Sequence, residues 1–125
     1  MIFGIVGYRY FTNYSLFQQH LQKIQKIYPL EKWTAIISGG ASGVDTLAKK
    51  YANQNNIDFI EYPANWKKYG TPYAAYRRNQ KIVDKSDVII AFVHPKSRGT
   101  WDTINRAKQK SLKNEDTIVH IIKVS

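Results

Sequence analysis

Short apolar runs alternate with amphipathic stretches along the whole of this 125-residue chain. Apolar runs of this length, with few charges, predict strands that are buried in a parallel sheet, and the amphipathic stretches predict the helices that cover it. The strands are expected at residues 2–6, 35–37, 57–62, 88–93 and 118–124. The alternation therefore predicts an α/β fold.

Four amphipathic segments are expected to form the covering helices, at residues 14–28, 44–52, 72–85 and 100–113. In the second of them, apolar side chains recur at i, i+3, i+4, i+7 and i+8, which gives one apolar stripe. Thr71 is the expected N-cap of the third helix, with Pro72 at its first position. Irregular segments are expected at residues 63–70 and 94–99.

The simplest arrangement of these elements is a Rossmann-like, doubly wound parallel sheet with strand order 3-2-1-4-5, because parallel crossovers are right-handed. The chain is 43% hydrophobic and 22% charged, which fits a single domain over residues 1–125. Ligands of such sheets bind outside the carboxyl ends of the strands, where the strand order reverses. The crevice between the first and fourth strands is therefore the expected site.

The composition excludes several kinds of chemistry. The chain contains no cysteine, which excludes disulfides, thiolate nucleophiles and cysteine-bound zinc and fits a reducing, cytoplasmic setting. No apolar run approaches the roughly 18 residues that a membrane-spanning helix needs, so no membrane partner is expected. The formal charge is +10, and residues 67–113 carry twelve cations and three anions, a net +9. This segment favours anionic partners such as nucleotides or nucleic acid.

A glycine-rich segment, residues 38–45, follows the second predicted strand and opens the second helix. Its backbone N–H groups could approach a phosphate, where the helix dipole also favours negative charge. The candidate ligands in it are Ser38, Gly39, Gly40 and Gly43. The alternative is that the glycines only permit a tight turn and close packing. The segment has neither the G-x-G-x-x-G dinucleotide pattern nor the lysine of a phosphate-binding P-loop, and we assign no cofactor.

Arg9 follows the first predicted strand closely, in the segment that begins at Gly7. A lone cation at the expected crevice is a candidate ligand for phosphate or carboxylate, because its planar guanidinium suits both. Asp45 lies in the first turn of the second predicted helix. A carboxylate there either stabilises the helix dipole, binds ribose hydroxyls or acts as an acid–base group.

The start of the fourth predicted helix offers further candidates. Ser97, Gly99 and Thr100 suit a second phosphate or a ribose, although Thr100 alternatively serves only as the N-cap. Arg98 is interpreted either as a ligand or as a surface charge. His94 has no partner at ligand spacing, so we interpret it as a loop residue and expect no metal site.

Aromatic residues and cations are interleaved around the third predicted helix. Trp66 precedes this helix, and Arg78 and Asn79 lie in its middle. Rings next to cations could stack a base while neutralising phosphates, whereas core packing explains some of the rings. Because neighbouring helical positions do not share one face, we expect Arg78 and Asn79 to point into the crevice as part of a lid and Arg77 to point outward.

Together these segments resemble the SLOG superfamily, specifically its YspA- and YpsA-related branch. Residues 7–11 resemble the branch's Gly-Ser-Arg-x-Phe, with Tyr8 in place of serine, and residues 38–45 resemble Ser-Gly-Gly-Ala-x-Gly-Ala-Asp. Residues 63–70 resemble Pro-Ala-x-Trp-x-x-Tyr-Gly, and residues 78–79 resemble its Arg-Asn pair. The resemblance covers nearly the whole chain and implies a Rossmann-like fold that binds nucleotides or nucleotide-derived signals such as ADP-ribose-like molecules.

Two relatives within the superfamily resemble the chain in different ways. The cytokinin-activating phosphoribohydrolases carry Pro-Gly-Gly-x-Gly-Thr-x-x-Glu, whose glutamate position is Thr103 here. Their reaction passes through an oxocarbenium-like centre that needs a carboxylate, so this activity would require Asp45 or Asp102 as the catalytic residue. The DNA-processing protein DprA has a similar glycine-rich segment and Arg-Asn pair, and its binding of single-stranded DNA would suit the basic residues 67–113.

The leading interpretation is a binding module that senses or sequesters a nucleotide or a nucleotide-derived small molecule. An N-glycosidic nucleotide hydrolase and a DprA-like single-stranded DNA binder are the alternatives. Assembly into a homo-oligomer stays open as well.

Overall fold

The computed structural model describes residues 1–40, 42–112 and 117–124. Its strands are Ile2–Gly7 (β1), Ala35–Ser38 (β2), Asp58–Glu61 (β3), Val88–Val93 (β4) and Ile118–Lys123 (β5). Its helices are Tyr14–Ile27 (α1), Val44–Gln54 (α2), Trp66–Tyr69 (α3), Tyr73–Lys85 (α4) and Arg98–Leu112 (α5), with a 3₁₀ turn at Leu30–Lys32 (η1). No helix in these ranges is long and apolar enough to cross a membrane.

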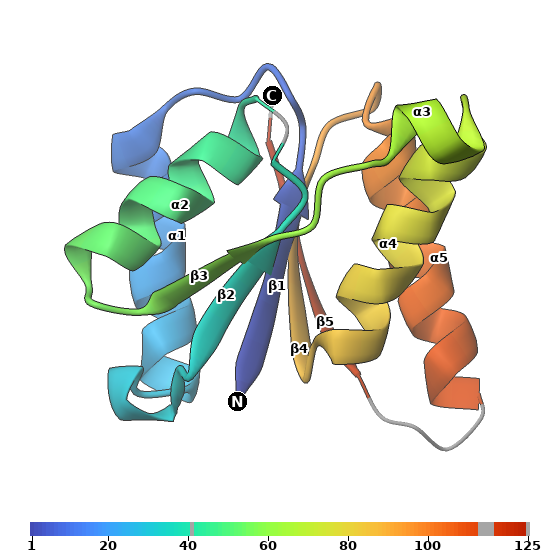
Figure 1. The fold of residues 1–125 in the computed structure, drawn as a ribbon. Coiled ribbons are helices and arrows are strands. Elements are labelled where there is room, and N and C mark those ends of the chain that lie inside the picture. The colour runs from blue at the N-terminus through green and yellow to red at the C-terminus, as the bar shows by residue number, and fades with distance from the viewer. Residues whose placement is uncertain (41, 113–116, 125) are drawn as a thin grey trace.

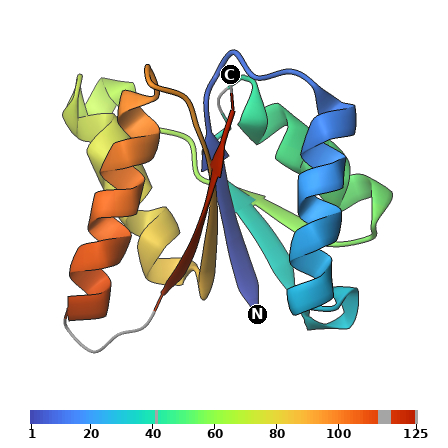
Figure 2. The same cartoon turned by 180° about the vertical axis from the view of Figure 1, so that it is seen from behind.

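The strands form one parallel sheet in the order β3-β2-β1-β4-β5, which confirms the predicted topology. Helices α1 and α2 cover one face of the sheet, and α3, α4 and α5 lie on the other side (Figure 1). The view from behind shows the same two helical layers with the sheet between them (Figure 2). The strand order reverses at β1, so the carboxyl ends of β1 and β4 border the switch point.

The central strands are buried on both faces, which explains why their sequences are almost continuously apolar. Every residue of β4 is buried. On the α1 and α2 side, Phe3 of β1 stacks on Trp33 with ring centroids 3.8 Å apart. On the other side, Ile82 of α4 and Ile104 of α5 belong to a second buried apolar cluster. The two cores hold the sheet rigidly beneath the segments that leave its carboxyl edge.

Two local expectations before α4 are wrong. The segment predicted to be irregular contains α3, whose first turn is capped by the Asn65 side chain accepting from the Lys68 N–H at 3.1 Å. Thr71 is not an N-cap, because α4 begins at Tyr73 and Pro72 occupies the N-cap position. Proline has no side-chain acceptor, so this helix starts without a side-chain capping bond.

The bounds of most other elements differ from the prediction by one or two residues, and the differences at β3 and α5 have a structural explanation. β3 is shorter and more exposed, because among the described strands only β2 pairs with it. Helix α5 begins at Arg98, so Gly99, which the sequence places in the preceding loop, lies in its first turn. The helix begins two residues before the predicted Thr100, because the Trp101 N–H already donates a helical hydrogen bond to the Ser97 carbonyl at 3.2 Å. The predicted end of this helix, Lys113, lies outside the described residues.

Candidate functional site

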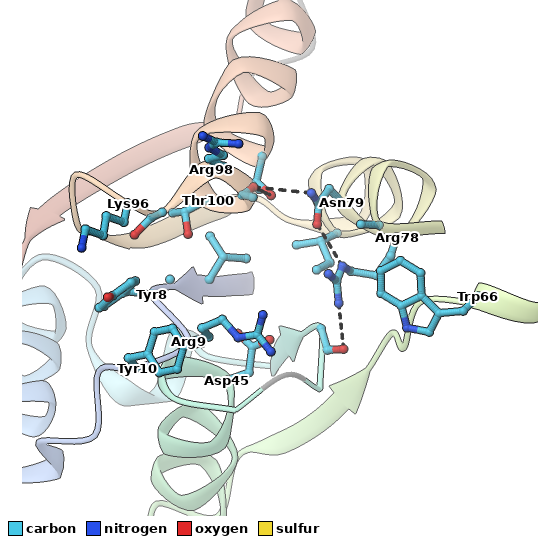
Figure 3. Close-up of a pocket in the computed structure, with 18 residues that line it drawn as sticks. Tyr8, Arg9, Tyr10, Asp45, Trp66, Arg78, Asn79, Lys96, Arg98 and Thr100 are labelled. Carbon is cyan, nitrogen blue, oxygen red and sulfur yellow. Dashed lines mark hydrogen bonds between the residues drawn. The ribbon is translucent and has the colours of Figure 1, made fainter. Parts of the chain in front are cut away.

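A cavity of about 460 Å³ opens at the carboxyl ends of the central strands, a volume typical of small-molecule sites. The segments that follow β1, β2 and β4 surround it, together with α4 and Trp66 (Figure 3). Most of the predicted ligand residues line it, namely Gly7, Arg9, Gly39, Asp45, Trp66, Arg78, Asn79, Ser97, Gly99 and Thr100. The fold thus brings together residues that are far apart in the sequence.

Other predicted site residues do not line this cavity, namely Ser38, Gly40, Gly43 and Asp102. Ser38 is fully buried, and its hydroxyl donates to the Ile5 carbonyl at 2.9 Å. This bond ties β2 to β1 beneath the cavity. Ala41, in the middle of the glycine-rich segment, lies outside the described residues.

Close packing explains two of the glycines in this segment. Gly43 has a φ of +73°, and a side chain there would overlap the backbone of Arg9. Gly40 has a φ of +78° and packs against the Glu61 side chain. Gly39 does line the cavity, and a side chain there would overlap the Arg78 guanidinium. The turn-and-packing interpretation therefore fits Gly40 and Gly43.

Arg78 reaches from α4 to the end of β2 (Figure 3). Its Nη1 donates to the Gly39 carbonyl at 2.9 Å, and its Nε donates to the Asn79 Oδ1 at 2.9 Å. These bonds use two of the five N–H donors of a guanidinium. Burial lowers the pKa of Arg78 below its ordinary value, and the negative charge of Asp45 opposes that shift. Arg78 is therefore an immobilised, partly desolvated cation in the cavity wall.

Asn79 connects Arg78 to polar side chains on the neighbouring helix. Its Nδ2 donates to the Asp102 carboxylate at 2.9 Å, and the Arg106 Nε donates to the same oxygen at 2.8 Å. Arg106 also donates to the Gln80 Oε1 at 3.1 Å. Asp102 thus holds Asn79 from outside the cavity, which differs from the position that the sequence suggests for a catalytic carboxylate.

Arg9 and Asp45 lie across the cavity from Thr100, beside the start of α2 (Figure 3). The Arg9 side chain is exposed, with its guanidinium carbon 5.5 Å from the centroid of the Tyr10 ring. Asp45 is only 8% exposed. The backbone of Arg9 is held in place, because its carbonyl accepts from the Ser42 hydroxyl at 3.3 Å. An exposed guanidinium on a fixed backbone can turn toward an anion that enters the cavity.

The cavity is also lined by Tyr8, Tyr10 and Lys96, which the predicted site omits, and by Arg98, which the sequence leaves open between a ligand and a surface charge. The Tyr8 ring stacks on His94 with centroids 4.2 Å apart and an interplanar angle of 8°. Tyr10 meets Tyr8 edge-on at 5.5 Å. The sequence could have indicated both tyrosines as site residues, because they lie in the segment that follows the first predicted strand. Lys96 carries no comparable signal, since an exposed lysine in a loop is ordinarily a solvated charge.

Positive charge predominates around the cavity. Among the described lining residues, the cations are Arg9, Arg78, Lys96 and Arg98, and the one acid is Asp45. The first turns of α2 and α5 both line the cavity, and helix N-termini attract anions. Within the part of the chain that the structure describes, no group of three or more His, Asp or Glu could hold a metal ion. The arrangement suits a small anionic ligand that also carries an aromatic group.

A parallel sheet in this order, with a cationic cavity at its switch point, defines a Rossmann-like α/β protein. The chain belongs to the YspA, cpYpsA-related SLOG family, whose family model matches residues 5–69, and the resemblance seen in the sequence is thereby confirmed. The matched range includes Arg9, Asp45 and Trp66, whereas Arg78 lies beyond it. No match is found among curated proteins or among solved structures.

Proposed function

We propose that this protein binds a nucleotide or a nucleotide-derived small molecule, such as an ADP-ribose-like signal, in the cavity at the carboxyl ends of β1 and β4. Sensing or sequestration of the ligand follows from binding alone. The observation that carries this proposal is the convergence of four cationic side chains on one cavity whose described walls contain a single carboxylate. Membership of the SLOG family supports nucleotide-related binding as well.

The contacts of the cavity suggest how such a ligand is held. A phosphate fits between Arg9 and Arg78, near the Gly39 backbone, because both guanidinium groups can offer N–H donors there. Thr100, in the first turn of α5, is the candidate partner for a ribose or a second phosphate. The stacked Tyr8 ring provides an aromatic wall for the base.

Calorimetric titration with AMP, ADP-ribose, cyclic ADP-ribose and NAD tests the proposal. At least one of these ligands is expected to bind, and Arg9→Ala is expected to weaken that binding about tenfold or more, because a hydrogen bond to a charged group contributes about 1.5–3 kcal/mol. Arg77→Ala is the matched control. Arg77 is exposed, its guanidinium lies over the Tyr69 ring at 4.2 Å, and it does not line the cavity. Silence with all four ligands, or equal losses in the two variants, contradicts the proposal.

Asp45 supports a second candidate function, the hydrolysis of an N-glycosidic bond in a nucleotide. It is the one acid among the described residues of the cavity wall, and it is nearly buried. In this reaction the bond between ribose C1′ and the base nitrogen breaks, the base takes a proton, and the hydroxyl of a water adds to C1′. A carboxylate in this position would stabilise the cationic ribose centre or activate the water.

The hydrolase proposal is tested by incubating the protein with AMP and measuring the release of free base by chromatography over several hours. Asp45→Asn is expected to abolish turnover, whereas Asp102→Asn should reduce it less, because Asp102 contacts Asn79 and Arg106 rather than the cavity. If the wild-type protein turns over none of the nucleotides that it binds, hydrolysis is excluded and the binding proposal is unaffected.

A further inference from the structure

A second hollow of about 520 Å³ lies beside the cavity described above. It is lined by Tyr62, Pro63, Ala64, Asn65, Trp66, Lys67 and Lys81. These residues come from the segment between β3 and α3, from α3 itself and from the outer face of α4. Its volume is again in the range of small-molecule sites.

Trp66 is the wall that the two hollows share, because it lines both. Trp66 is 52% exposed, so part of its indole is accessible to a ligand. In Figure 3 it lies at the end of the first cavity that is farthest from Tyr8 and Lys96. A ligand that fills the first cavity and continues past Trp66 therefore enters the second hollow. An exposed indole in this position suits stacking of a nucleobase.

The charge of the second hollow has the same sign as that of the first. Lys67 and Lys81 are both exposed cations, and none of the described residues lining this hollow is acidic. Tyr62 adds a further aromatic ring to the wall. The combination of an aromatic platform with two ammonium groups suits a base and a phosphate together, rather than an apolar ligand.

We propose that the ligand is made of two nucleotide units joined through phosphate, with the first unit in the main cavity and the second laid over Trp66 into the side hollow. This inference rests on the proposed function and names its substrate class. The joined pair could be a free dinucleotide or the end of a single-stranded oligonucleotide. Both present the same chemistry to Trp66, Lys67 and Lys81.

The test compares AMP with 5′-phosphorylated diadenylate in calorimetric titrations of the full chain. The wild type is expected to bind diadenylate at least about tenfold more tightly than AMP, since one base stacked on an aromatic ring has an effect of this size. The double variant Lys67→Gln/Lys81→Gln should lose a measurable part of this difference, because it removes both ammonium groups of the side hollow, and should keep its affinity for AMP. The matched control is Lys68→Gln/Lys85→Gln, which removes two exposed lysines from the same helices but leaves the side hollow intact.

The outcomes separate this inference from the function on which it rests. Equal affinity of the wild type for the two ligands, or equal behaviour of the two double variants, overturns the inference alone. Failure of the wild type to bind diadenylate overturns the inference, whereas the proposed function is overturned only if AMP, ADP-ribose, cyclic ADP-ribose and NAD fail to bind as well. A deoxyadenylate decamer then distinguishes the sources. Tighter binding than diadenylate, with a steep dependence on salt, supports an oligonucleotide end, and no gain over diadenylate supports a free dinucleotide.

Trp66→Ala provides a second measurement on the platform itself. This variant should weaken binding of diadenylate more than binding of AMP, because only the longer ligand extends beyond the indole. An equal loss for both ligands would place the whole ligand in the main cavity and overturn the inference.

Discussion

Replacing Gly43 with alanine is expected to lower the free energy of unfolding by about 3 kcal/mol. Gly43 has a φ of +73° and a ψ of −126°, a conformation that is almost restricted to glycine. A Cβ atom would also overlap the Arg9 backbone and approach the Tyr8 carbonyl oxygen. These atoms belong to the segment that leaves β1, so they cannot shift without moving the cavity wall. The thermal midpoint should fall by roughly 10 °C.

Gly99→Ala is the matched control for this prediction. Gly99 lies in the first turn of α5, and nothing stands within 4 Å of the place where its Cβ would be. This variant should therefore unfold at nearly the wild-type temperature, or slightly above it. Circular dichroism measures the free energy of unfolding of both variants in urea and their unfolding temperatures on heating. A Gly43→Ala protein as stable as Gly99→Ala would show that the two segments are not locked together at this residue.

Replacing Arg78 with methionine is expected to weaken nucleotide binding about a hundredfold and to lower the free energy of unfolding by about 1–3 kcal/mol. Methionine keeps most of the aliphatic stem but removes the charge and both hydrogen bonds. The Gly39 carbonyl and the Asn79 Oδ1 would lose the donors that Arg78 supplies. Calorimetry measures the first effect, and thermal unfolding without ligand measures the second.

Two companion variants separate charge from geometry at this position. Arg77→Met removes a neighbouring exposed cation on α4 and should leave both measurements near the wild-type values. Arg78→Lys keeps the charge but cannot donate to Gly39 and Asn79 together, because an ammonium lacks the planar fork. It should therefore recover only part of the affinity. Full recovery with lysine would mean that charge alone matters and that the hydrogen bonds do not.

The topology could be predicted from the sequence because its causes are local and repeated. Each buried strand is a continuous apolar run, each helix has an apolar stripe, and right-handed crossovers leave few ways to connect them. The rule that ligands bind where the strand order reverses then brought Arg9, the glycine-rich segment and the start of α5 to one edge of the sheet. Helical spacing predicted that Arg77 and Arg78 would point in different directions, and of these two Arg78 is the one that lines the cavity.

The details of the site depend on contacts between distant residues, and these leave no local pattern. Gly39 and Gly40 are adjacent, yet one meets Arg78 and the other meets Glu61. Nothing in the sequence near Asp102 indicates Asn79 as a partner for its carboxylate, but Asn79 on another helix donates a hydrogen bond to it. The short helix α3 was missed for a related reason, since it is a single turn that one asparagine side chain caps.

The two arginines of the cavity should leave different thermodynamic signatures. Arg78 is already ordered before any ligand arrives, because its bonds to Gly39 and Asn79 are made during folding. Its contribution to binding therefore carries little loss of conformational entropy and should be recorded mainly as heat released. Arg9 is exposed, so ordering its side chain around an anion would cost conformational entropy and offset part of the attraction. The cavity thus combines one cationic side chain that is ordered before a ligand binds, Arg78, with one that would become ordered on binding, Arg9.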